Sequence, residues 1–288
     1  MNLDDAVQLF IQDRETSSCG IYAIKAYQQH LMLLSKFLRS RNTTCIEEVS
    51  PHQLISYLAD LRSHNLSPAT VRQRATHIRT FFRWVHTVKL INTDPSDSIL
   101  IPRRPKQLPK TLKPAEIKTL AATELPTRDK ALLFLILDSG LRRSEVAQLE
   151  LDDVDLQRGM AHVRHGKGNK ERWVIFADKA RDALTAWLHE RHALCGVSAL
   201  FTTKDGEAIK PGGIYKAVRR AALKAGVPAR PHRLRHTFAT NYLDRGGNIH
   251  DLQALMGHES ITTTMIYVSV SLQKIREHYK QLSLLDNL

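Results

Sequence analysis

Cysteine is scarce in this chain, and long apolar runs are absent. Three cysteines in 288 residues, at positions 19, 45 and 195, are too few and too scattered for a disulfide framework or a zinc cage. The longest apolar run extends only from Ala131 to Leu137, whereas a membrane-spanning helix needs about 20 such residues. The acidic first residues lack the basic start and apolar core of a signal peptide. We therefore expect a soluble, cytoplasmic protein.

Acidic residues are also in short supply relative to basic ones. The chain has 42 lysines and arginines against 29 aspartates and glutamates, and a net charge of +13. Residues 1–100 carry 11 basic against 9 acidic side chains, whereas residues 101–288 carry 31 against 20. This balance indicates a polyanionic partner that binds mainly the second part. The length predicts about two domains.

The first hundred residues are predicted to form short helices. Apolar residues recur three and four positions apart, as on the buried face of an amphipathic helix. The stripes are Ile24, Tyr27, Leu31, Leu34 and Leu38; Leu54, Tyr57, Leu58 and Leu61; and Val71, Ala75, Ile78, Phe82 and Val85. Ser50-Pro51 and Ser67-Pro68 supply a cap and a first-turn proline to two of these helices. We expect an α-helical domain over residues 1–97.

A stripe of arginines accompanies the last of these helices. Arg72, Arg79 and Arg83 follow one another along one face without intervening acids. Such a stripe is either a solvated face or a phosphate-binding surface, and the missing acids favour phosphate contact. The helical domain is followed by a linker over 98–113, predicted to be extended and semi-rigid because it is rich in proline. Its basic residues include Arg103, Arg104 and Lys106.

From residue 114 onward the sequence predicts helices around a small sheet near 151–176. Two short predicted strands, over 161–165 and 170–176, flank the glycine-rich stretch 166–169, which indicates a hairpin with Lys167 at its tip. A lysine in such a turn is by default simply solvated. Before the hairpin, Gly140 lets the chain turn sharply between two helices, and Arg142 and Glu145 are three positions apart on the second. A cation at a helix start opposes the helix dipole, which suggests a functional position held by the carboxylate.

The most informative residues stand near the end of the chain. His232 and Arg235 are three apart on one helical face, His258 follows Gly257, and Tyr267 comes nine positions later. Arginine grips phosphate oxygens, histidine donates a hydrogen bond or moves a proton, and tyrosine can form a covalent intermediate. The combination predicts a site that holds a phosphodiester and attacks its phosphorus.

Other interpretations of these residues are less specific. His232 and His236 are four apart and could bind a metal ion, but no further ligands follow at zinc spacing, so we expect no metal. His236 is instead expected to pack inward or support its helix. Tyr267 could be an ordinary core residue, and Tyr242 and Tyr279 are rival tyrosines at other distances from the Gly-His unit.

In these motifs the chain resembles the tyrosine recombinase (phage integrase) family, in its small Xer-like form. The matching motifs, spread over roughly the last 180 residues, are Gly140-Leu141-Arg142-x-x-Glu145, Gly166-Lys167-Gly168-x-Lys170-x-Arg172, His232-x-x-Arg235-His236, Leu255-x-Gly257-His258 and Tyr267. The resemblance implies a two-domain clamp on DNA. A mainly α-helical fold would comprise a SAM-like core-binding domain and, over 114–288, a catalytic domain with a small antiparallel sheet.

The resemblance also implies a mechanism without cofactor or metal. Arg142 and Arg235 would clamp the scissile phosphate, supported by Glu145. His232 and His258 would add hydrogen bonds, and His232 could accept the tyrosine proton. Tyr267 would attack, leaving a 3′-phosphotyrosyl enzyme and a 5′-hydroxyl protonated by Lys167. The 5′-hydroxyl of a partner strand would then reverse the step, exchanging strands.

Further expectations concern partners. The family assembles as four protomers on two double-stranded DNA sites, here as a homo- or hetero-tetramer at the nucleoid. Apolar positions of the tail would exchange between protomers or fold back on their own domain; they are Val270, Leu272, Ile275, Tyr279, Leu282 and Leu285. A translocase or DNA-bending accessory proteins are possible partners. The target sequence and the choice among chromosome dimer resolution, transposon or plasmid resolution and phage integration stay open.

Two rival functions share this pattern. A type IB topoisomerase uses the same tyrosine chemistry but reseals the same strand, whereas the separate helical domain and the apolar tail favour an assembling recombinase. A non-catalytic DNA-binding regulator could retain the fold, but a pure binder needs no nucleophile. A protein–DNA adduct on a nicked duplex separates catalysis from binding. Deletion or inversion between two plasmid sites separates recombination from relaxation.

Overall fold

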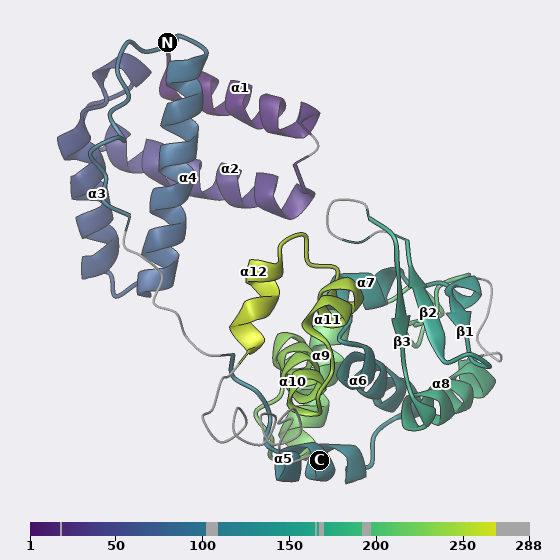
Figure 1. The fold of residues 1–288 in the computed structure, drawn as a ribbon. Coiled ribbons are helices and arrows are strands. Elements are labelled where there is room, and N and C mark those ends of the chain that lie inside the picture. The colour runs from purple at the N-terminus through teal and green to yellow at the C-terminus, as the bar shows by residue number, and fades with distance from the viewer. Residues whose placement is uncertain (18, 102–108, 165, 167–169, 192–196, 269–288) are drawn as a thin grey trace, which may run out of the picture. The chain divides into compact units, whose positions relative to one another are not determined.

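The chain folds into two compact units, Met1–Lys106 and Gln107–Leu288, which meet in the sequence inside the predicted linker. The computed structural model describes residues 1–17, 19–101, 109–164, 166, 170–191 and 197–268 (Figure 1). Five sequence predictions lie outside these residues. They concern Lys167, Arg103, Arg104, Lys106 and the apolar tail beyond residue 268.

The N-terminal unit consists of helices packed around one apolar core. Its elements are α1 (Leu3–Thr16), α2 (Ile21–Arg39), η1 (Ile46–Glu48), α3 (Pro51–Ser63) and α4 (Pro68–Thr87). Ser50 and Ser67 cap α3 and α4 as the sequence predicts, each accepting a backbone N–H of the first turn. The predicted apolar stripes are buried, except that Tyr27 is half-buried with its ring edge against Phe10. The helical prediction for this region is therefore confirmed.

The basic face of α4 is only partly open to solvent. Arg83 is exposed, whereas Arg72 and Arg79 are half-buried. A guanidinium N–H of Arg79 donates to the carbonyl of Ile99, so this arginine also fastens the segment after α4. The predicted contact of these arginines with phosphate stays a prediction.

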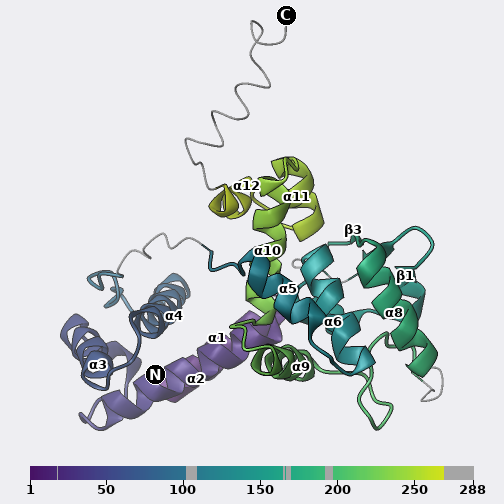
Figure 2. The same ribbon diagram turned by 90° about the horizontal axis from the view of Figure 1, so that it is seen from below.

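The C-terminal unit is mostly helical with one small sheet. Its elements are α5 (Pro114–Ala122), α6 (Thr127–Ser139), α7 (Arg143–Gln148), η2 (Leu151–Asp153), β1 (Val154–Asp155), β2 (Met160–Val163), β3 (Arg172–Ile175), α8 (Asp178–Arg191), α9 (Pro211–Lys224), α10 (Pro231–Asp244), α11 (Ile249–Met256), α12 (Ile261–Thr264) and η5 (Met265–Tyr267). In both views α12 lies next to α11 (Figures 1 and 2). None of the helices described combines the length and apolar character required to cross a membrane.

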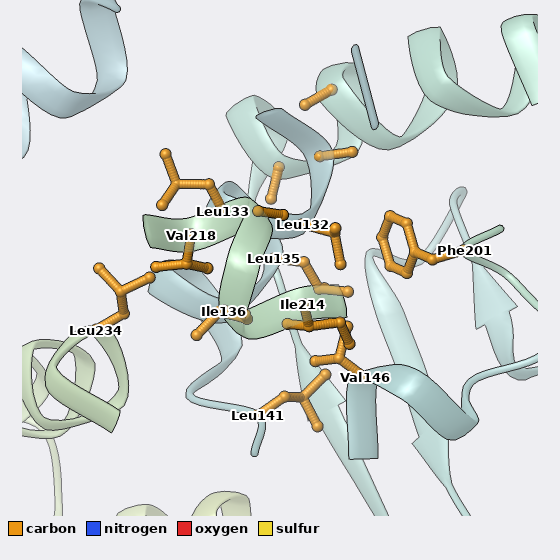
Figure 3. Close-up of a cluster of buried hydrophobic side chains, with 14 of the residues drawn as sticks. Leu132, Leu133, Leu135, Ile136, Leu141, Val146, Phe201, Ile214, Val218 and Leu234 are labelled. Carbon is orange, nitrogen blue, oxygen red and sulfur yellow. The ribbon is translucent and has the colours of Figure 1, made fainter. Parts of the chain in front are cut away.

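Helix α6 is the centre of this unit. Its run from Ala131 to Leu137 is apolar on all sides, as in a helix enclosed by others, and the helix packs against α8, α9 and α10. Leu132, Leu135 and Ile136 are fully buried, and Figure 3 shows them among side chains from α9 and α10. The helix ends at Gly140, whose φ of +64° favours glycine. A Cβ there would lie 2.3 Å from the Phe238 ring, so the turn is also pressed against α10.

The sheet has the order β1-β2-β3 and is antiparallel throughout. Ala161, Val163 and Val174 face the core, in agreement with the period of two expected for a half-buried sheet. On the opposite face, His162 stacks on its cross-strand partner Trp173 with ring centroids 4.7 Å apart. The predicted strands of the hairpin are confirmed, and β3 begins at Arg172, beside the residues described next.

Candidate active site

A buried carboxylate organises the site. Glu145, in the first turn of α7, has a side chain only 2% exposed. It accepts hydrogen bonds from the backbone and the guanidinium of Arg142, both at 2.7 Å, and two more from Arg172 at 2.8 and 3.0 Å. Arg235 lies 4.0 Å away. One acid therefore holds three guanidinium groups together.

The surroundings keep Glu145 ionised. Burial raises the pKa of its carboxyl, but the hydrogen bonds and charges of Arg172 and Arg142 together outweigh burial, so the pKa lies below its ordinary value. Its negative charge compensates part of the positive charge of the cluster. Without it, three cations would face one another in a partly dehydrated site.

The three arginines also bind the end of α11. A helix leaves its last carbonyls without intrahelical partners, and its C-terminal end favours cations. Here each of three consecutive carbonyls accepts a hydrogen bond from a different arginine. The carbonyl of Leu255 accepts from Arg172 at 2.8 Å. Those of Met256 and Gly257 accept from Arg235 at 2.7 Å and from Arg142 at 3.3 Å, respectively. The arginine cluster therefore fixes the start of the segment that carries His258 and Tyr267.

Arg235 is the most deeply buried of the three. Its side chain is 3% exposed, compared with 26% for Arg142. Desolvation, followed by the charge of Arg142, lowers its pKa to about 9, so that it is still a cation at neutral pH. It also donates to the carbonyl of Gly140 at 2.5 Å. The left-handed turn after α6 thus supplies one of the groups that position this guanidinium.

Gly257 is required where α11 ends. Its φ is +61°, and a Cβ would lie 3.0–3.1 Å from the Arg172 guanidinium. We expect Gly257→Ala to lower the free energy of unfolding by about 1–2 kcal/mol, the cost of a left-handed conformation in other residues. Urea denaturation measures this effect. Gly212→Ala is the control because its Cβ would meet no atom within 4 Å, and an equal loss in both variants would contradict the prediction.

His258 connects the arginine cluster to the helix that follows. Its Nε2 lies 3.2 Å from Nη2 of Arg235, and its Nδ1 lies 3.0 Å from the buried hydroxyl of Thr264. Because a guanidinium only donates, Nε2 accepts and Nδ1 carries the hydrogen of the neutral ring. The ring is stacked nearly parallel to that of Tyr267, with centroids 6.4 Å apart.

Tyr267 is buried, with 4% of its surface exposed, but its hydroxyl has a polar partner. The ring packs among Ala239, Leu252 and Met256. The hydroxyl lies 2.8 Å from Nδ1 of His236. Burial raises the pKa of the phenol, while the positive charges of Arg235 and Arg142 oppose that rise. The phenol is therefore neutral at pH 7 and within electrostatic reach of two arginines.

Five of the residues predicted from sequence meet in this site: Arg142, Glu145, Arg235, His258 and Tyr267. His232 is exposed on α10 with its ring centroid 4.0 Å from that of His236. Within the described residues, no three histidine, cysteine or acidic side chains are grouped to hold a metal ion.

Sequence reasoning missed two residues. Arg172 was visible only as the last position of the hairpin motif, and nothing in that motif indicates its bonds to Glu145. His236, expected to pack inward or support its helix, is half-buried and bonded to the hydroxyl of Tyr267. The sequence signal for a role of His236 near the site was its position one helical turn after His232.

A cleft of about 520 Å³ opens beside the cluster, between β3 and α11. Arg172 and His258 line it, together with Lys170, Gln253 and Gly257. Two acids, Glu171 and Glu259, also line it, so its charge is mixed. The cleft gives access to Arg172 and His258 from outside the cluster.

Comparison with known proteins identifies the family. Residues 105–274 match the phage integrase family, and residues 13–87 match the phage integrase N-terminal SAM-like domain. The tyrosine recombinase XerD of Ralstonia nicotianae is 33% identical over 269 residues, covering 90% of this chain and 87% of that protein.

Two solved structures are also similar. The XerA recombinase is 28% identical, with a TM-score of 0.55, covering 96% of this chain and 98% of that one. The Tn1549 transposon integrase, solved in complex with a circular intermediate DNA, has a TM-score of 0.78 and 19% identity, covering 96% and 99%. This last likeness supports the fold alone. The chain belongs to the phage integrase family of tyrosine recombinases, enzymes that cleave and rejoin DNA in site-specific recombination through a tyrosine-linked intermediate.

Proposed function

We propose that Tyr267 is the nucleophile of this recombinase and that Arg142 and Arg235 bind the scissile phosphate. The observation that carries this assignment is the shared site: the phenol lies within electrostatic reach of both guanidinium groups, beside His258. Arginines at this position stabilise negative charge that builds on the non-bridging oxygens as phosphorus is attacked. Arg142 is the more exposed of the two and offers the first contact to an entering phosphate.

The remaining assigned groups complete the reaction. Attack by the Tyr267 oxygen on phosphorus forms a 3′-phosphotyrosyl bond and releases the 5′-oxygen. Lys167 donates a proton to that oxygen, and His232 hydrogen-bonds to the phosphate. His258 accepts from Arg235 and so helps to hold one of the guanidinium groups that bind the phosphate. The reverse reaction with the 5′-hydroxyl of a partner strand exchanges the strands. Glu145 acts through the arginines by holding them in place.

Double-stranded DNA would contact both units. Arg72, Arg79 and Arg83 place cationic side chains on α4, and Arg83 is the exposed one of the three. Guanidinium groups of this kind donate to phosphate oxygens of the DNA backbone. The linker residues Arg103, Arg104 and Lys106 would add further contacts to the DNA backbone.

We further propose that four protomers, identical or of two kinds, assemble on two DNA sites at the nucleoid in the cytoplasm. The apolar positions of the tail after residue 268 support an exchange of C-terminal segments between protomers, since an apolar terminal stripe needs a partner surface. A translocase or DNA-bending proteins would regulate such an assembly.

Trapping the covalent intermediate tests the assignment. A cognate site is first selected from genomic fragments, and a duplex nicked beside the cleavage position then releases a short strand, so that the adduct accumulates. We expect proteolysis and mass spectrometry to find the DNA remnant on the peptide that contains Tyr267. A remnant on Tyr242 or another residue contradicts the assignment.

Assembly and strand exchange need a second measurement. A plasmid with two selected sites is expected to yield deletion or inversion products, according to their orientation. Sedimentation of the protein–DNA complex should give four protomers for two sites. Relaxed circles as the only product would contradict strand exchange and indicate a topoisomerase-like reaction.

A further inference from the structure

A second histidine contacts the proposed nucleophile. The Tyr267 hydroxyl, in η5, lies 2.8 Å from Nδ1 of His236, in α10. The two rings are 5.4 Å apart. Thirty-one residues separate them in the sequence, so the contact is made by the fold and not by a local motif.

The electrostatic surroundings determine the direction of this hydrogen bond. Burial, followed by the charges of His232 and Arg235, lowers the pKa of His236 to about 4, so its ring is neutral in ordinary buffers. The phenol of Tyr267, with its raised pKa, keeps its hydrogen. The hydroxyl therefore donates, and Nδ1 of the neutral imidazole accepts.

We propose that His236, rather than His232, accepts the phenolic proton when Tyr267 attacks DNA. The step rests on Tyr267 being the nucleophile. As the bond from Oη to phosphorus forms and the bond from phosphorus to the 5′-oxygen breaks, the proton moves from Oη to Nδ1 of His236. The 5′-oxygen receives its own proton from the general acid. The imidazolium that results lies close to the anionic phosphodiester.

The other histidines of the site are less suited to this step. Both ring nitrogens of His258 are engaged, one with Arg235 and the other with Thr264. His232 is exposed, and its ring lies against that of His236. It therefore offers a path by which the proton leaves His236 for solvent.

A weak base is sufficient because the phenol becomes acidic during the reaction. In the free enzyme, transfer from a phenol to His236 is strongly unfavourable. The phenolic oxygen loses electron density to phosphorus as the new bond forms, so the proton becomes transferable late in the step. A correctly placed base of this kind contributes roughly 10²–10⁴-fold to rate.

Two substitutions test the proposal. His236→Asn places an amide oxygen near the position of Nδ1, so it keeps the hydrogen bond but takes up no proton. His236→Leu removes both functions. We expect each to slow single-turnover adduct formation on the nicked duplex by about 100-fold, the low end of general-base effects. DNA affinity and the free energy of unfolding of His236→Asn should stay near those of the wild type.

Acidifying the nucleophile separates proton transfer from positioning. With 3,5-difluorotyrosine at position 267, the phenol needs less help to lose its proton. In His236→Asn, we expect the fluorinated tyrosine to raise the rate of adduct formation at least about tenfold, which recovers part of the lost general-base contribution. In the wild type, the same change should alter the rate far less. His232→Asn should show no comparable recovery.

Three results would overturn the proposal: a wild-type rate in His236→Asn, no gain from the fluorinated tyrosine in that variant, or recovery in His232→Asn instead. An inflection of the wild-type rate near pH 6.5 would also count against His236, since a histidine with a pKa of about 4 is neutral well below that pH. If the DNA remnant maps to another residue, the nucleophile assignment fails by itself, whatever these variants show.

Discussion

Tyr267→Phe is expected to bind its DNA site with unchanged affinity and to form no covalent adduct. The substitution removes one oxygen and keeps the ring among Ala239, Leu252 and Met256. Its structural consequence is limited to the hydrogen bond with His236, worth about 0.5–1.5 kcal/mol. The catalytic consequence is much larger, because loss of a nucleophile lowers the rate by at least about 10⁴-fold. Gel electrophoresis of the denatured complex measures the adduct.

Tyr242→Phe provides the matched control. Tyr242 is a half-buried tyrosine of the same small apolar cluster, with its ring 6.0 Å from that of Phe238. Removing its hydroxyl should leave adduct formation within about twofold, as expected of a residue that touches no reacting atom. Adduct at the wild-type level in Tyr267→Phe, or its loss in Tyr242→Phe, would exclude Tyr267 as the nucleophile.

The helices and the sheet follow from local patterns, which explains why they could be predicted. The apolar stripe of α2 and the caps of α3 and α4 depend on residues within one or two turns. The run from Ala131 to Leu137 has no polar side and so indicates an enclosed helix, which α6 is. Glycine at position 140 likewise indicates the turn that the backbone makes there.

The bonds that build the site could not be predicted in this way. Arg172 is 83 residues from Leu255 and 27 from Glu145, and no periodic pattern connects them. The motif shows that an arginine ends the hairpin, but only the fold shows that its guanidinium is used between α7 and α11. The same holds for His236, which was expected to pack inward or support its helix, whereas its partner comes from a segment 31 residues away.

The functional role of Arg142, unlike these bonds, could be inferred from the sequence. A cation at the start of α7 is unfavourable for the helix, so its presence indicated a role beyond stability. The structure adds the reason why the helix tolerates it: the Glu145 carboxylate binds both its backbone N–H and its guanidinium. The position of Arg142 was informative because helix stability alone would favour an anion, not a cation, at the start of a helix.

Glu145→Gln is expected to lower the free energy of unfolding of the C-terminal unit by about 3–5 kcal/mol, the usual cost of removing one partner from a buried ion pair. The amide has nearly the same shape, so the effect comes from charge and hydrogen bonding. Its NH₂ group faces guanidinium donors where the carboxylate accepted from Arg142 and Arg172. Arg235, with a side chain 3% exposed, loses the nearby anion that balances it. Calorimetry of the full chain measures the loss.

The effect should depend on pH in a defined direction. The pKa of Glu145 is lowered in the folded protein, so its contribution to stability is fully present above the unfolded value of about 4.3 and is lost as the pH falls through the lower, folded value. The difference between wild type and Glu145→Gln should therefore be constant from pH 8 to pH 5 and shrink in more acidic buffer. A difference that grows on acidification would contradict this account.

Glu171→Gln is the control for a general effect of losing an acid near β3. An Oε2 atom of Glu171 lies 3.2 Å from Nε2 of His162, but the Glu171 side chain is 65% exposed. Exposed pairs contribute at most about 1 kcal/mol, so this variant should unfold almost as the wild type does.

Glu145→Gln should also lose adduct formation, because the arginines and the end of α11 depend on one carboxylate for their placement. Similar stability and activity in the two variants would show that the buried acid does not organise the site.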